Sequence, residues 1–291
     1  MTRTSEQSAT VSIDMGRTTV HVVTDGFFRI DAGTMFGMVP RSSWEKVAPP
    51  DDANRLRLAI RCLVVDRPDG LIVVETGFGT RLSPDAAAYY RWNNDDTLVQ
   101  RLGELGIDPA DVTHVIQTHL HLDHAGGLTR RDEDGRLVPT FPNATLLVQR
   151  RELDAALHPD ALTRGSYSSD DIAPLLDRGL VEPIDGYTEP VHGIACLPTG
   201  GHSAGHQAVR VTGGGRTLLY PGDVLPAACN LRPAWISSYD IDPHTTLRAK
   251  ADLCRRAAAK EALVTLVHDA DAPVYRLQLV NDKYIAEPYE G

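Results

Sequence analysis

The residues best suited to chemistry lie in one short stretch of the sequence, 118–127, which reads THLHLDHAGG. Imidazole and carboxylate groups are the usual protein ligands of zinc and similar metals. In an extended segment alternate side chains point the same way, so His119 and His121 can hold one cation together. The spacing therefore predicts a metal site that begins at the end of a buried strand.

The second half of this stretch predicts a second cation beside the first. Asp123 and His124 follow a turn of the chain and can reach that cation. We expect Gly126 and Gly127 to let the backbone turn tightly. The alternative is a histidine-rich surface loop without metal, but such loops rarely place four ligand-type residues directly after a buried strand.

Three weaker motifs follow further along the chain. His202 lies at the tip of a glycine-rich turn, 199–206, Asp223 follows a predicted strand, and His268 follows another. Taken alone, the first is an ordinary turn, Asp223 a turn former or helix cap, and His268 a structural histidine. Asp223 and His268, like His119, fall directly after predicted strands, where loop-borne chemistry gathers on a rigid sheet.

The segments between these motifs predict an α/β protein with mixed sheets, because helices and strands interleave in both halves of the chain. Asp95 and Asp96 precede an apolar stripe that ends at Gly106, as expected for a capped amphipathic helix. Pro243 suits the first turn of another helix. The predicted strands are 19–25, 56–65, 71–75, 112–118, 142–149 and 262–267, with hairpin turns at 67–70 and 213–215, and the predicted helices are 95–106, part of 151–180, and Pro243 to about Lys260.

Composition limits the classes of partner and location. The chain has 291 residues and a net charge of −10, which argues against a nucleic-acid backbone as its partner. Residues 1–10 are polar and are expected to be a flexible N-terminal segment, with no apolar stretch after them that resembles a signal peptide. No run is long and apolar enough to span a bilayer, so we expect no membrane partner and a cytoplasmic location.

The ordered set HxHxDH, GHSxGH, GD and a late strand-end histidine resembles the signature of the metallo-β-lactamase superfamily. The resemblance extends from the first predicted hairpin to His268 and implies one domain over 1–291, an α/β fold built as a four-layer αβ/βα sandwich. It implies two divalent metal ions, with zinc expected and iron, manganese or cobalt as alternatives. By position, the ligands are His119, His121 and His202 for one metal, Asp123, His124 and His268 for the other, and Asp223 as the bridging carboxylate.

The same resemblance implies a hydrolytic mechanism in which a metal-bridging hydroxide attacks the substrate. Asp123 is the expected catalytic residue, holding the hydroxide and then protonating the leaving group. Glu75 stands where many relatives have an aspartate, and we expect it and His206 to orient metal ligands rather than bind metal.

Within the superfamily, segments 33–40 (GTMFGMVP), 130–142 and 234–236 (AWI) resemble the branch of quorum-quenching N-acyl homoserine lactonases. The resemblance implies a small-molecule lactone or ester substrate, and a homodimer is compatible with it. An apolar groove for an acyl chain is predicted from several side chains, although each alone also suits a protein core. The predicted contacts are Phe27, Phe28, Met35, Phe36, Met38 and Trp235.

One departure concerns a tyrosine that some of these lactonases place shortly after the bridging aspartate. Here 224–228 reads VLPAA, and neither Tyr220 nor Tyr239 matches that position.

A phosphotriesterase-like enzyme and a glyoxalase II-like thioesterase would share the metal site. A β-lactamase would need an export signal. A nuclease would need a basic surface or an extra domain, and an oxygen-reducing di-iron relative would need a glutamate at position 121. Outside enzymes, the alternative is a metal-stabilised binding scaffold.

Overall fold

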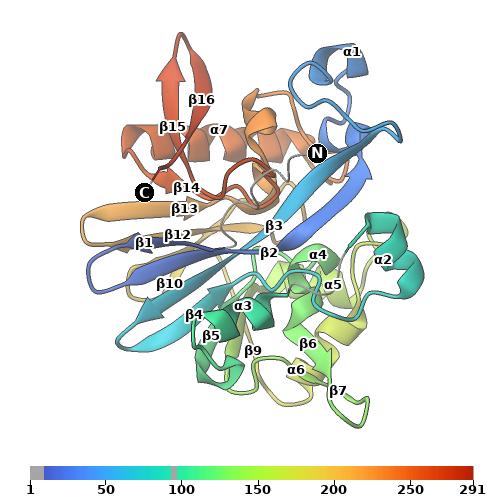
Figure 1. Cartoon of the computed structure of the whole chain (residues 1–291), viewed down its shortest axis with the longest axis vertical. Helices are drawn as coiled ribbons and strands as arrows, with labels where there is room; N and C mark the ends of the chain where they lie inside the picture. Colours follow the sequence, from blue (N-terminus) through green and yellow to red (C-terminus); the bar gives the residue numbers. More distant parts are fainter. Residues whose placement is uncertain (1–9, 93–96, 291) are drawn as a thin grey trace, which may run out of the picture.

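Two seven-stranded sheets form the centre of the computed structural model, which describes residues 10–92 and 97–290. They lie across the middle of the molecule in Figure 1. The first sheet has the order β1-β2-β3-β4-β5-β8-β9 and the second runs from β10 to β16 in sequence order, while β6 (Thr129–Arg131) and β7 (Leu137–Pro139) form a small separate ribbon. The strands of the first sheet are β1 (Thr10–Asp14), β2 (Thr19–Asp31), β3 (Arg55–Arg67), β4 (Gly70–Val74), β5 (Val112–Ile116), β8 (Thr145–Gln149) and β9 (Val181–Ile184). Those of the second are β10 (Thr188–Val191), β11 (Ile194–Pro198), β12 (Gln207–Gly213), β13 (Arg216–Tyr220), β14 (Leu263–Val264), β15 (Tyr275–Val280) and β16 (Lys283–Pro288).

Three hydrophobic clusters show how the layers stack. One joins the first sheet to helices on its outer face, a second lies between the two sheets, and a third joins the second sheet to α7. In Figure 1, α7 lies on one side of the strands and α3, α5 and α6 on the other. This is the predicted αβ/βα sandwich. The helices are α1 (Arg41–Trp44), α2 (Pro84–Tyr90), α3 (Leu98–Glu104), α4 (Leu122–Ala125), α5 (Arg150–Leu157), α6 (Ala173–Leu176) and α7 (Pro243–Ala259).

Both predicted hairpins are confirmed. Strands β3 and β4 pair antiparallel with Arg67 opposite Gly70, so the turn is as tight as the sequence indicated. Strands β12 and β13 pair in the same way, with Gly213 opposite Arg216. The hairpins place the ends of β4 and β13 on the side of the sheets from which the predicted ligand segments continue.

Helix α7 begins as its sequence predicts. The side chain of Asp242 accepts a hydrogen bond from the backbone N–H of Thr245 at 3.0 Å, and Pro243 occupies the first turn. The helix buries Leu253, Cys254 and Ala257 against the second sheet. Its N-terminus therefore holds the segment before it, residues 225–242, close to the metal-ligand loops.

Several predicted boundaries differ from the structure. Within the segment 151–180, predicted as partly helical, α5 ends at Leu157 before His158 and Pro159, because a residue that precedes proline avoids the helical region. Strand β14 is shorter than the predicted 262–267. The N-terminal segment 1–10 was expected to be flexible, but Thr10 begins β1 opposite Val23, while residues 1–9 lie outside the described part. The predicted cap at 95–96 also lies outside the described residues.

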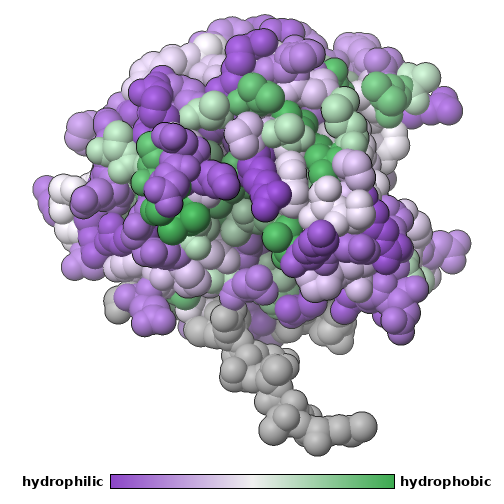
Figure 2. All heavy atoms as spheres, turned by 90° about the horizontal axis from the view of Figure 1, so that it is seen from above, coloured by the Kyte–Doolittle hydropathy of each residue, from purple (hydrophilic) through white to green (hydrophobic). Residues whose placement is uncertain are grey.

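Two observations concern the surface of the described residues. No helix there is long and apolar enough to cross a membrane. The upper face in Figure 2 carries hydrophobic side chains in small groups separated by hydrophilic ones. Scattered apolar residues of this kind are common on protein surfaces and need no partner to explain them.

Candidate metal centre

The predicted ligands converge at one edge of the sandwich, between the two sheets. His119 and His121 lie in the extended segment that follows β5, and Asp123 and His124 lie on the short helix α4. The remaining three follow elements of the second half of the chain. They are His202 in the loop between β11 and β12, Asp223 after β13 and His268 after β14.

Ligand-type atoms of these residues form three overlapping groups, in each of which all atoms lie within 4.8 Å of one another. The first and third groups match the two ligand sets that the resemblance implied. The second group brings Asp223 together with one histidine of each set, as a bridging carboxylate requires. The groups are His119, His121 and His202, then His119, His124 and Asp223, and then Asp123, His124 and His268.

The two oxygens of Asp223 face different sides of the cluster. Oδ2 lies 3.4 Å from Nε2 of His202, whereas Oδ1 lies 3.2 Å from Nε2 of His268 and 3.4 Å from Nε2 of His124. Asp123 adds a second carboxylate, its Oδ2 lying 3.5 Å from Nε2 of His268. One carboxylate thus stands between the two ligand sets and the other belongs to one of them.

The donor atoms fit two divalent cations. Nε2 of His119, Nε2 of His124 and Oδ1 of Asp223 are buried without a hydrogen-bond partner, an arrangement that is costly unless a cation satisfies them. Nδ1 of His121 and Nε2 of His202 lie 3.1 Å apart. Two ligands on a tetrahedral zinc, each at 2.0–2.1 Å, would be about 3.3 Å apart, so the spacing suits one shared ion.

Glu75 orients His124, as the sequence suggested. Oε2 of Glu75 lies 2.8 Å from Nδ1 of His124, and Oε1 accepts a hydrogen bond from the backbone N–H of Thr118 at 2.6 Å. Glu75 is fully buried and has a φ of 66°, a conformation that costs energy for a residue other than glycine. The longer side chain therefore reaches both partners from the end of β4 at a conformational cost.

Two further histidines have fixed orientations. Nδ1 of His202 lies 2.6 Å from Oδ1 of Asp240, and Nδ1 of His268 lies 2.9 Å from the carbonyl oxygen of Ala59. Because a carboxylate and a carbonyl only accept, both Nδ1 atoms carry hydrogen and Nε2 is left with the lone pair. Such partners of the second ring nitrogen are typical of metal-ligating histidines. No local sequence pattern points to Asp240, which lies 38 residues after the histidine that it orients.

His206 is engaged on both ring nitrogens. Nδ1 lies 2.6 Å from the hydroxyl oxygen of Thr199, and Nε2 accepts a hydrogen bond from the backbone N–H of Asp223 at 3.0 Å. No lone pair remains for a metal. The contact instead fixes the backbone that carries the bridging carboxylate.

Burial and the two carboxylates divide the histidines into two classes. Burial, with the neighbouring histidines, lowers the pKa of His119, His121 and His206 well below the ordinary value. For His124, His202 and His268 burial also acts to lower the pKa, but nearby carboxylates outweigh it and raise the pKa. Burial would raise the pKa of Asp223, and these three histidines instead hold it well below its usual range. The metal-free cluster therefore binds protons where cations would bind.

The two glycines of the first motif are required for a different reason from the predicted turn. Gly126 has an ordinary helical φ of −59°. A Cβ on it would lie 2.4 Å from the carbonyl oxygen of Phe78, and one on Gly127 would lie 2.0 Å from that of Thr76. The pair lets α4 pack directly on the backbone that follows Glu75.

A pocket of about 300 Å³ opens over the ligands. Of the predicted acyl-chain contacts, Met35 and Phe28 line it. Phe36 is fully buried and stacks on Trp44 with ring centroids 5.0 Å apart, so it belongs to the core. Met38 is 93% exposed and does not line the pocket. The other walls come from residues that the sequence did not single out, namely Ile30, Leu58, Phe78, Tyr90, Leu122, Leu162, Gly165, Ser166, Pro226 and Ser237, and from Tyr239.

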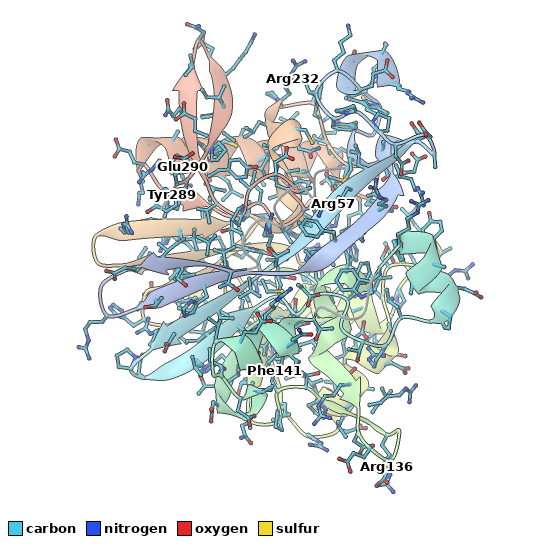
Figure 3. The ribbon with its side chains drawn as sticks, viewed as in Figure 1. Arg57, Arg136, Phe141, Arg232, Tyr289 and Glu290 are labelled. Carbon is cyan, nitrogen blue, oxygen red and sulfur yellow. The ribbon has the colours of Figure 1, made fainter. Side chains whose placement is uncertain are left out.

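Phe27 and Trp235 do not line this pocket either, and an arginine lies over each of their rings. The guanidinium of Arg57, on β3, lies 3.4 Å from the ring centroid of Phe27 (Figure 3). That of Arg232 lies 4.6 Å from the ring centroid of Trp235. Since side chains alternate along β2, Phe28 faces the pocket and Phe27 the opposite side.

Glu152 is a functional neighbour that the sequence analysis missed. This fully buried carboxylate accepts hydrogen bonds from the backbone N–H of Leu120 (3.0 Å), the hydroxyl of Ser203 (2.6 Å), the backbone N–H of Gly205 (2.9 Å) and the hydroxyl of Tyr167 (3.1 Å). It joins the loops of the first and second motifs. The role of Glu152 becomes visible only in the folded structure, where a buried helix residue contacts two distant loops. No local sequence pattern could predict these contacts.

Comparisons with known proteins agree with this geometry. The Metallo-beta-lactamase superfamily matches residues 56–266. The chain is 31% identical over 232 residues to the N-acyl homoserine lactonase AttM of Azorhizobium caulinodans, covering 72% of this chain and 81% of that protein. It is 32% identical over 182 residues to the N-acyl homoserine lactonase AiiA of Bacillus thuringiensis subsp. kurstaki, covering 59% of this chain and 65% of that protein.

Solved structures share the fold. A probable metal-dependent hydrolase from Staphylococcus aureus superposes with a TM-score of 0.87 at 23% identity, covering 96% of this chain and 99% of that one. AidC, a dizinc quorum-quenching lactonase, superposes with a TM-score of 0.79 at 17% identity, covering 97% and 98%. Together with the ligand cluster, these matches show that the chain belongs to the metallo-β-lactamase superfamily and is a metal-dependent hydrolase.

Proposed function

We propose that the protein uses two zinc ions to open the lactone ring of N-acyl homoserine lactones or closely related lactones. The observation that carries the proposal is the composition of the pocket. Asp123, Asp223 and three of the histidines line it, and so do the apolar side chains of Phe28, Met35, Leu58 and Phe78. A lactone that carries an acyl chain has the same two parts, a polar ring to be hydrolysed and an apolar tail.

The relatives support the substrate class. AttM and AiiA are both named N-acyl homoserine lactonases. The AidC structure contains the product of such a reaction and is described as dizinc. The ligand set of this chain, with histidines and carboxylates in three overlapping groups, suits the same metal.

The chain's own residues divide the chemistry between them. When bound, the two cations would acidify water and polarise the carbonyl group of the substrate. Asp123 is partly exposed in the pocket and belongs to the ligand set of His124 and His268, so its carboxylate can take the proton of the attacking water. As water adds to the carbonyl carbon, the bond from that carbon to the ring oxygen breaks. The ring oxygen then takes the proton from Asp123 and becomes a hydroxyl group.

The orienting contacts keep the ligands in place during this reaction. Glu75 holds His124, Asp240 holds His202, and His206 holds the backbone of Asp223. Each contact holds an atom that does not face the other metal ligands, namely Nδ1 of His124, Nδ1 of His202 and the backbone nitrogen of Asp223. The donor atoms therefore need little rearrangement when metal binds.

The test is lactone opening followed with a pH indicator on three forms of the protein. These are the protein as purified, the chelator-stripped protein, and the stripped protein given two equivalents of zinc, cobalt or manganese. We expect turnover that is lost on stripping and restored best by zinc. If no metal form opens any acyl homoserine lactone, the lactonase proposal fails.

The same panel separates the alternatives. Turnover of thioesters or phosphotriesters without lactone opening would move the protein to another hydrolase class with the same metal site. Full metal content without turnover of any ester, lactone or thioester would favour a metal-stabilised binding scaffold.

A further inference from the structure

Four hydroxyl groups line the metal pocket, those of Tyr90, Ser166, Ser237 and Tyr239. Ser237 donates to the carbonyl oxygen of Thr34 at 3.0 Å, and the hydroxyl of Tyr239 lies close to the side chain of Thr34. The hydroxyls of Tyr90 and Ser166 have no hydrogen-bond partner within residues 10–92 and 97–290. These two are therefore free to bind a ligand in the pocket.

Tyr90 has a fixed position on one side of the pocket. It is the last residue of α2, and its ring centroid lies 5.2 Å from that of Phe78 and 6.2 Å from that of Phe28. Phe28 in turn lies edge-on against the ring of His268, with centroids 5.3 Å apart. This aromatic series places Tyr90 beside the ligand set of Asp123, His124 and His268.

The electrostatic surroundings keep this hydroxyl neutral. Burial, followed by the charge of Asp123, raises the pKa of Tyr90 to about 12. A neutral phenol donates a hydrogen bond and does not compete with Asp123 for a proton. A phenol is also a stronger donor than the aliphatic hydroxyl of Ser166.

The reaction needs such a donor, and the segment after the bridging aspartate cannot supply one. Residues 224–228 read VLPAA and contain no side-chain hydroxyl. As water adds to the carbonyl carbon, the electron pair of the C=O bond moves to the oxygen, which becomes negatively charged until the ring C–O bond breaks. A hydrogen bond that strengthens with this charge accelerates the step.

We propose that Tyr90 is a catalytic residue whose hydroxyl donates a hydrogen bond to the carbonyl oxygen of the substrate as that oxygen gains charge. This inference rests on the proposed hydrolysis of a lactone. It assigns the donor to a helix far from the bridging aspartate in sequence, since α2 ends 133 residues before Asp223.

The test compares Tyr90→Phe with Tyr89→Phe in the zinc-loaded protein. Tyr89 is the neighbouring residue on the same helix, is largely exposed and does not line the pocket, so its variant is a matched control. Phenylalanine at position 90 retains the ring contacts with Phe28 and Phe78. Measurements of metal content and melting temperature check that each variant folds. We expect Tyr90→Phe to lower kcat about 10- to 100-fold with KM within about threefold, and Tyr89→Phe to change neither.

A binding measurement gives a second, turnover-free readout. A phosphonate analogue of the tetrahedral species carries negative oxygen where the carbonyl oxygen stood. We expect its affinity to fall about 10- to 100-fold in Tyr90→Phe, with the affinity for the ring-opened product nearly unchanged. Equal kcat and equal phosphonate affinity in wild type and Tyr90→Phe, with wild type opening lactones, would overturn the role of Tyr90 alone. A different outcome is that the wild-type protein opens no lactone, while Tyr90→Phe binds the phosphonate more weakly than wild type does. That outcome would contradict the substrate class and support Tyr90 as the donor to the anion.

Discussion

Nδ1 of His202 lies 2.6 Å from a carboxylate oxygen of Asp240, and both side chains are almost completely buried. The other nitrogen of the same ring faces His121 and Asp223. The carboxylate thus determines which nitrogen of His202 is available to a metal. It also couples the ligand to the loop that precedes α7.

Replacing Asp240 with alanine is expected to weaken metal binding about 10- to 100-fold, since the orienting partner of a ligating histidine is lost. Asp240→Asn retains an acceptor and should lose less. The measurement is zinc affinity by competition with a chromophoric chelator. Asp242→Ala is the control, because Asp242 caps α7 and its loss should cost about 1 kcal/mol of stability without changing zinc affinity. Equal affinities for Asp240→Ala and Asp242→Ala would contradict the orienting role.

Asp123→Asn is expected to reduce kcat far more than metal content. The amide retains an oxygen ligand but cannot accept and return a proton, so the loss in kcat should be about 10²- to 10⁴-fold. Metal content by atomic absorption and kcat on the same preparation decide the matter. A parallel loss of both would mean that Asp123 serves only as a ligand.

Glu152→Ala is expected to destabilise the protein by about 2–4 kcal/mol, because two buried backbone N–H groups, of Leu120 and Gly205, lose their acceptor. Urea unfolding of the metal-free protein measures this directly. Tyr167→Phe removes a single partner of the same carboxylate and should cost much less. Similar unfolding midpoints for the two variants would show that Glu152 does not join the two loops as the hydrogen bonds indicate.

Zinc affinity is expected to rise with pH across the neutral range. In the metal-free cluster the pKa values of His124, His202 and His268 are raised, so protons compete with the cations until the pH exceeds those values. The same raised pKa values stabilise the metal-free fold below pH 6.5, and this contribution is lost as the pH rises through them. As the pH rises above 6.5, the melting temperature of the stripped protein should fall while the increase caused by zinc grows. Calorimetry on both forms would show whether the two trends run in opposite directions.

The effect of Tyr90→Phe on kcat is expected to be independent of pH from 7 to 10. Burial, followed by the charge of Asp123, raises the pKa of Tyr90 to about 12 in the metal-free protein, so we expect its hydroxyl to remain a donor over this whole range. The ratio of wild-type to variant kcat should therefore stay constant. A ratio that declines towards 1 above pH 9 would show that the hydroxyl ionises within the range, contrary to its burial beside Asp123.

The sequence by itself determined which residues to propose as ligands. His119, His121, Asp123 and His124 lie within six consecutive positions after a buried strand, and this spacing predicts donor atoms close together. Asp223 and His268 follow predicted strands, where a chain leaves a sheet at one edge, and His202 lies in a glycine-rich turn. Hairpin turns and the proline-started helix were equally readable, because turn and cap chemistry depends on neighbouring residues only.

Only the tertiary structure decided what surrounds those ligands. Asp240, Glu152 and Tyr90 reach the site from a loop and two helices, and no local pattern specifies which distant side chain a buried histidine or carboxylate will meet. The apolar wall was predicted only in part for the same reason: Phe36 lies in the core and Met38 in solvent, although they are two residues apart. Which face of a segment meets a pocket depends on how the whole chain packs, and burial between elements far apart in sequence decides it.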